Sequence, residues 1–86
     1  MPEISRFFGI VIKMYFDEHP PPHFHAEYGE FKAVVDINSL VVVGGYLPPR
    51  VLGLVVEWAA QHRSELLALW DRAGKMQPLS KIPPLV

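Results

Sequence analysis

The chain has no cysteine, almost no net charge and no long apolar run, and each absence excludes a class of protein. Without cysteine there are no disulfides, thiolate metal ligands or cysteine nucleophiles. Eight Lys and Arg against nine Asp and Glu give a net charge of −1, so no broad positive field favours DNA binding. No apolar stretch approaches the ~18 residues of a membrane span, and no cleavable signal pattern opens the chain. We therefore expect a soluble cytoplasmic protein with neither DNA nor a membrane as partner.

The residues that are present suffice for one small core. The chain has 86 residues, of which 50% are hydrophobic and 12% aromatic, which predicts a single domain over residues 1–86. Strand-forming residues occupy about 7–46, a helical pattern about 48–74, and a proline-bearing tail 75–86. Strands followed by a helix predict the α+β class. We expect an antiparallel meander of three to four strands with one long C-terminal helix packed on one face.

Alternation of apolar and polar residues places the strands. The first is predicted over residues 8–16, with Phe8, Ile10, Ile12, Met14 and Phe16 on the inner face. Two more are predicted over 23–28 and 31–37, joined by a two-residue hairpin in which Gly29 supplies the positive φ of a type II′ turn. A fourth follows near 40–43. The hairpin fixes a register with inner pairs Tyr28–Phe31, Ala26–Ala33 and Phe24–Val35, and outer pairs Glu27–Lys32, His25–Val34 and His23–Asp36.

The helix over residues 48–74 is predicted to begin at Pro48-Pro49 and to end at Gly74. Its apolar stripe is wide and includes His62, which we expect to be a hydrogen-bonded core residue. The tail leaves two alternatives open. It folds back over an outer apolar strip of Val34, Val41 and Val43, or that strip and the free edge of the last strand bind a small partner protein or a second copy. The apolar stripe of the predicted helix comprises Leu52, Val55, Ala59, His62, Leu66, Leu69 and Ala73, widened by Val51, Trp58 and Trp70.

Three of the four histidines fall within seven residues, and His23, His25 and Glu27 share one strand face. The hairpin register adds Lys32 to that face. One hypothesis is acid–base chemistry on a phosphodiester, because histidine as a residue type suits proton transfer in His23 or His25 and Glu27 offers a second acid–base group. Lys13 or Lys32 would stabilise charge that develops on phosphate oxygens. The candidate acid–base set is therefore His23, His25, Glu27 and Lys32.

A second hypothesis is a metal site, because a His-x-His pair on one strand presents both rings to one ion. The candidate ligands are His19, His23 and His25, with Glu27 or Asp36 completing the shell, and a divalent metal such as zinc as the cofactor. An ordinary solvated sheet face of paired polar residues explains the same pattern without any site. The residues alone leave these alternatives open, including whether the protein is an enzyme.

Several segments resemble one small prokaryotic family, catalogued as domain of unknown function 4160. They are residues 1–7, residues 14–19, the Pro-His-Phe-His-Ala-Glu-Tyr-Gly run at 22–29, and residues 57–65. Members of that family are often encoded beside another small protein, as toxin–antitoxin pairs are. The resemblance therefore implies a toxin–antitoxin-type module that acts through a partner protein, with RNA as a candidate target. It assigns no residue roles, and a His-based metal-binding protein or a non-catalytic protein-interaction domain remains the alternative.

Overall fold

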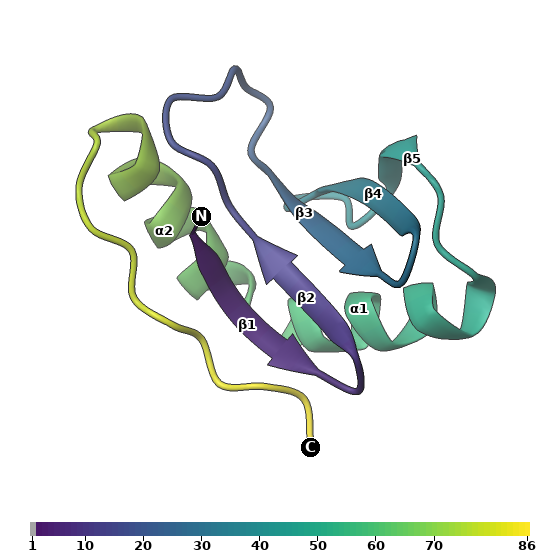
Figure 1. Cartoon of the computed structure of the whole chain (residues 1–86). Helices are drawn as coiled ribbons and strands as arrows, with labels where there is room; N and C mark the ends of the chain where they lie inside the picture. The colour runs from purple at the N-terminus through teal and green to yellow at the C-terminus, as the bar shows by residue number, and fades with distance from the viewer. Residues whose placement is uncertain (1) are drawn as a thin grey trace.

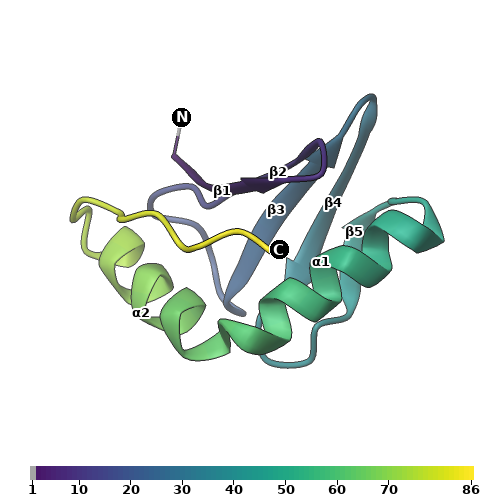
Figure 2. The ribbon, with the colours of Figure 1, turned by 90° about the horizontal axis from the view of Figure 1, so that it is seen from below.

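The computed structural model describes residues 2–86, and a five-stranded antiparallel sheet in the order β1-β2-β3-β4-β5 forms its centre. Two helices, α1 (Pro49–Gln61) and α2 (Arg63–Gly74), lie on the same side of this sheet (Figures 1 and 2). The predicted α+β class and antiparallel meander are confirmed, whereas the number of strands and the single helix are not. The strands are β1 (Glu3–Phe7), β2 (Ile10–Lys13), β3 (His23–Tyr28), β4 (Phe31–Asp36) and β5 (Val42–Gly45).

The additional strand, β1, precedes the predicted first strand, and a hairpin turn takes the place of the first two residues of that prediction. Phe8 and Gly9 both have positive φ, 49° and 78°, and join β1 to β2 as a two-residue turn. Phe8 continues the apolar alternation, so the pattern conceals the turn; the side chain is 60% exposed instead of buried. Phe16, also predicted to face inward, is 39% exposed because β2 ends at Lys13. The predicted inner residues Ile10, Ile12 and Met14 are buried.

The hairpin between β3 and β4 has the predicted register. Gly29 has a φ of 58°, as the two-residue turn requires. The turn is short, so it fixes which residues face each other, and the alternation of Phe24, Ala26, Ala33 and Val35 then keeps apolar side chains on the buried face. All six predicted cross-strand pairs are present, from His23↔Asp36 to Tyr28↔Phe31.

The predicted helix is two helices, separated at His62. That residue has φ −125° and ψ 23°, and its Nδ1–H donates to Glu65 Oε1 at 2.6 Å. Arg63 Nε donates to the carbonyl of Ile37 at 3.2 Å, which ties the start of α2 to the end of β4. Because the sheet is twisted, the change of direction lets both helices bury their apolar stripes on it. Within residues 2–86, neither helix is long and apolar enough to cross a bilayer.

The tail lies along β1, at the opposite edge of the sheet from β5 (Figure 1). The Ile82 N–H donates to the Ile4 carbonyl at 2.8 Å, and Trp58 Nε1–H donates to the Pro83 carbonyl at 2.9 Å. The side chains of Ile82 and Leu85 join the core. The tail therefore does not cover the outer apolar strip, where Val41 and Val43 are 56% and 57% exposed.

Candidate metal centre and the cavity beside it

The candidate site lies on the outer face of the sheet, and its His23 end meets Trp70 of α2. Antiparallel pairing aligns side chains of neighbouring strands in rows across that face. One row runs Lys13, His25, Val34 and Gly44, and the next runs Val11, Glu27 and Lys32. His23 begins a further row opposite Asp36. The period of two along β3 thus puts His23, His25 and Glu27 on one face, as the sequence predicts.

A carboxylate from the loop before β3 joins the two histidines. Glu18 Oε1 lies 2.9 Å from His25 Nε2 and 3.1 Å from His23 Nε2. The three potential ligand atoms all lie within 4.8 Å of one another. The side chains are half-buried, with 29%, 23% and 13% of Glu18, His25 and His23 exposed. The predicted ligand His19 is exposed and lies outside this cluster, although it is adjacent to Glu18 in the chain.

Both ring nitrogens of His23 face oxygen atoms that accept hydrogen bonds. Its Nδ1 lies 2.8 Å from the carbonyl oxygen of Pro21, which only accepts, so Nδ1 carries a hydrogen. Its Nε2 faces Glu18 Oε1, which also only accepts when the carboxyl is ionised. A neutral imidazole has only one N–H. The contact between Nε2 and Glu18 therefore needs a second proton or a cation.

Aromatic contacts hold both imidazole rings in place. The ring of Tyr15 meets the ring of His25 edge-on, with centroids 4.6 Å apart. Trp70, on α2, lies against His23 with centroids 4.9 Å apart. Packing of this kind restricts rotation of the rings, so their nitrogens stay directed at Glu18 without the ordering cost that mobile ligands would incur.

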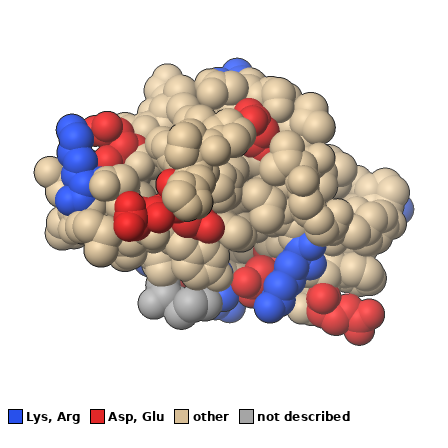
Figure 3. Space-filling model, turned by 90° about the horizontal axis from the view of Figure 1, so that it is seen from above, with Lys and Arg blue, Asp and Glu red and all other residues tan. Residues whose placement is uncertain are grey.

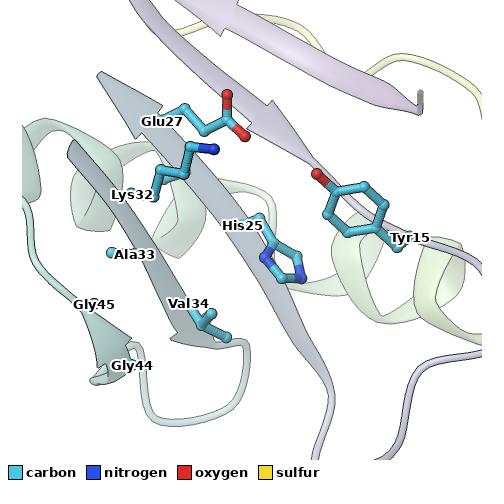
Figure 4. A pocket seen from close by; sticks show the side chains of 9 residues that line it. Tyr15, His25, Glu27, Lys32, Ala33, Val34, Gly44 and Gly45 are labelled. Carbon is cyan, nitrogen blue, oxygen red and sulfur yellow. The ribbon is translucent and has the colours of Figure 1, made fainter. Parts of the chain in front are cut away.

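Three of the four residues in the predicted acid–base set line one cavity of about 370 Å³. They are His25, Glu27 and Lys32, and the cavity is completed by Tyr15 and by residues of β4 and β5 (Figure 4). His23, the fourth, lies outside the lining and reaches His25 through Glu18. Among the described residues, Lys32 belongs to no ion pair, whereas Glu27 Oε1 is paired with Lys13 Nζ at 3.1 Å.

Asp36, predicted as an additional ligand, serves the turn after β4 instead. Its Oδ1 accepts the backbone N–H groups of Ser39 and Asn38 at 2.9 and 2.8 Å. These hydrogen bonds to the ionised form, the one from Ser39 foremost, hold the pKa of Asp36 below its ordinary value, and nearby His23 acts in the same direction. The carboxylate is therefore committed to local structure and lies outside the Glu18–His23–His25 cluster.

The surface charge does not concentrate into a basic patch on the face seen from above. Figure 3 shows Lys and Arg side chains standing apart from one another there, separated by a mostly uncharged surface. Nucleic-acid binding through phosphate contacts depends on clustered positive charge. This view, together with the net charge of −1, does not favour a broad nucleic-acid interface on that face.

Glu18 is the site residue that sequence reasoning did not assign. It precedes His23 by five positions and is separated from it by His19 and three prolines. No period applies to such a segment, because prolines exclude regular pairing and the loop path is set by tertiary contacts. The available signal was an acidic side chain close in sequence to a His-x-His pair.

Comparison with known proteins identifies the family without supplying a role. The model of the family described as "Domain of unknown function (DUF4160)" matches residues 9–71, a span that contains β2 to β5, α1 and most of α2. No curated protein and no solved structure matches the chain. The matched span includes Glu18, His23, His25 and the residues that line the cavity. The chain therefore belongs to the DUF4160 family.

Proposed function

We propose that the protein binds a divalent transition-metal ion through Glu18, His23 and His25. The observation that carries the proposal is the double acceptor environment of His23. With a cation in place, His23 is the neutral tautomer that donates from Nδ1 to Pro21 and coordinates through Nε2. Metal-binding histidines usually hold their second nitrogen in this way, with the N–H directed at a backbone carbonyl or a carboxylate.

The ligand geometry supports an ion of the size and preference of Zn²⁺. Ligands in a tetrahedral zinc site lie about 2.0–2.1 Å from the metal, which separates them from one another by about 3.3 Å. The separations of 2.9 and 3.1 Å between Glu18 and the two imidazoles need to widen by only a few tenths of an ångström, and the two imidazole nitrogens lie within 4.8 Å of each other. Two imidazoles and one carboxylate suit zinc and related first-row metals better than Mg²⁺ or Ca²⁺, which prefer oxygen-only shells.

The experiment is a zinc titration of untagged, metal-stripped protein against a competing chelator, together with elemental analysis of protein from metal-replete growth. We expect one zinc ion per chain. Glu18→Gln keeps the size of the side chain and removes its charge, and we expect at least a tenfold loss of zinc affinity. Unfolding in urea without metal shows whether this variant is still folded.

Glu65→Gln is the matched control, because Glu65 also accepts a hydrogen bond from a histidine, His62, but has no second histidine beside it. It should bind zinc as the wild type does. His19→Ala should also leave affinity unchanged, since His19 lies outside the cluster. Protein that neither retains zinc nor binds it in titration, or equal affinities for Glu18→Gln and Glu65→Gln, would overturn the proposal.

We also propose that the protein acts through a partner protein, as a module of toxin–antitoxin type. The supporting observation is the free edge of β5, flanked by the exposed side chains of Val41, Val43 and Tyr46. An exposed edge strand beside apolar side chains is a common place for another chain to add a strand. Action on RNA stays a prediction.

Co-expression with the product of the adjacent gene tests the partner role. We expect co-elution in size-exclusion chromatography. Val43→Lys should abolish co-elution, because a charged side chain beside an edge opposes strand addition. Glu57→Lys, at an exposed position on α1, is the control and should leave the complex intact. Separate elution of the two wild-type proteins would contradict the proposal, and a homodimer would show that the edge serves self-association.

A further inference from the structure

The cavity on the outer face adjoins the proposed metal centre through one shared residue. His25 directs Nε2 at Glu18, and the same imidazole ring lines the cavity. Tyr15, which packs against that ring, lines the cavity as well (Figure 4). The volume of about 370 Å³ falls within the range of small-molecule sites.

The hollow exists because Gly44 has no side chain. Gly44 lies in the cross-strand row of His25 and Val34, whose side chains project from the outer face. A Cβ built at Gly44 would lie 3.7 Å from Val34 Cγ2, which is an ordinary contact, and its φ lies outside the left-handed region. The fold would thus accept a side chain at this position. Any residue larger than glycine would fill part of the cavity.

The charges of the lining favour an anion. Glu27 is neutralised by its ion pair with Lys13 at 3.1 Å. Lys32 is the cation that lines the cavity without an ion-pair partner among residues 2–86. Its amino group is directed towards the space that Tyr15 and Glu27 also face (Figure 4). A metal ion bound at His25 would add a second positive charge beside the cavity, in the cross-strand row next to that of Lys32.

Three protein ligands leave a coordination position open. Zinc sites that serve only structure have four protein ligands, whereas sites with three leave room for water or a bound ligand. The three side chains of the cluster are partly exposed rather than sealed in the core. His25 belongs to both the cluster and the cavity lining, so a ligand in the cavity would approach the open position beside this residue.

We infer that the cavity takes a small organic phosphate or phosphonate, with the anionic oxygens between the metal ion and Lys32 and an apolar body against Val34 and Gly44. This inference rests on the proposed metal centre and names the ligand class of that site. Charge-assisted contacts of phosphate oxygens with lysine and with a metal ion supply the orientation. The apolar body occupies the hollow that the absent side chain of Gly44 leaves.

Phenylphosphonate is the probe, because it combines a phosphonate with an aromatic ring and has no ester bond to hydrolyse. Binding to the zinc-loaded protein is measured by calorimetry, and the cobalt-loaded protein shows by its visible spectrum whether the anion reaches the metal. We expect one ligand per chain, a spectral change, and weaker binding of inorganic phosphate, which lacks the apolar body. Metal-free protein should bind phenylphosphonate at least tenfold more weakly.

Two variants locate the ligand. Lys32→Ala should weaken phenylphosphonate binding about tenfold or more, since it removes a charge-assisted contact. Gly44→Val should weaken binding at least as much by filling the hollow. Both keep all three metal ligands, so a zinc titration of each reports whether the fold is intact. Lys75→Ala, at an exposed lysine after α2, is the control and should bind as the wild type does.

The outcomes separate the two proposals. Zinc binding without any phenylphosphonate binding, or with equal binding by wild type, Lys32→Ala and Gly44→Val, would overturn the ligand assignment and leave the metal centre standing. An unchanged cobalt spectrum at saturating phenylphosphonate would also overturn it, because the anion would then not contact the ion. Failure to bind zinc would overturn the proposed metal function, and the ligand assignment with it.

Discussion

Replacing Ile82 with alanine should destabilise the whole domain, although this residue lies in a tail without regular secondary structure. The side chain is only 4% exposed and belongs to the same core as the sheet and both helices. Removing a buried isoleucine side chain costs about 2–5 kcal/mol, and a site near the end of the chain can relax towards the lower half of that range. The hydrogen bond from the Ile82 N–H to Ile4 is a backbone interaction, so it survives the substitution.

A loss of about 2–3 kcal/mol is large for this chain. Domains are stable by about 0.05–0.15 kcal/mol per residue, which gives about 4–13 kcal/mol for 86 residues. With a urea dependence of about 1–3 kcal/mol per molar, Ile82→Ala should lower the unfolding midpoint by about 1–2 M. Urea titrations followed by tryptophan fluorescence measure this, because Trp58 is buried beneath the tail and donates its indole N–H to Pro83.

Val86→Ala is the control for Ile82→Ala, because Val86 is fully exposed and its truncation should change stability by less than about 0.5 kcal/mol. If both variants unfold at the midpoint of the wild type, the tail does not pack as described. Trp58→Phe gives a second measure, since it leaves the Pro83 carbonyl without its donor. We expect a loss of about 1–3 kcal/mol, and no loss in urea titrations would refute the contact.

Three further predictions concern backbone geometry and pH. Gly45→Ala should destabilise the domain by about 1–3 kcal/mol or more, because its φ is +74° and a Cβ would clash with the backbone carbonyl oxygen of Lys32; an unchanged thermal midpoint would contradict this. Gly53→Ala should instead stabilise it by about 0.5–1 kcal/mol, since it lies inside α1 with open space around it, and a lower midpoint would refute the helix assignment. The pKa of Asp36 lies below its usual 3.8 in the folded chain, so its stabilisation is present above about pH 4 and lost as pH falls through the folded-state pKa. As pH is lowered below about 4, the urea unfolding midpoint of Asp36→Asn should therefore fall less steeply than that of the wild type. Parallel curves would show that the hydrogen bonds to Asp36 do not lower its pKa in the folded chain.

Sequence patterns predicted the local features because those features depend on neighbouring residues. The β3–β4 register follows from a short turn at Gly29 and strict alternation on both sides of it, and all six predicted pairs are present. The turn at Phe8 and Gly9 escaped prediction for a related reason. Phe8 continues the apolar alternation, and a bulky residue with positive φ is not expected from its own preferences. The break at His62 was concealed in the same way by an uninterrupted helical period.

Local patterns also predicted one part of the candidate site, whereas tertiary contacts place the other part. The period of two on β3 alone places His23, His25 and Glu27 on one face, and the hairpin adds Lys32. The sequence could not place Glu18 between the two imidazoles, because three prolines separate it from His23 and the loop path depends on contacts with the rest of the fold.

By itself, the sequence determined that this chain forms an α+β meander with a histidine-bearing outer face, because alternation, turn length and helical period are local properties. The tertiary structure decided which carboxylate meets the histidines, that Trp70 from α2 packs against His23, and that the tail covers β1 instead of the outer valines. The contacts of Trp70 and of the tail join residues far apart along the chain, and the loop that carries Glu18 takes its path from tertiary packing, so this geometry is set only when the helices settle on the twisted sheet.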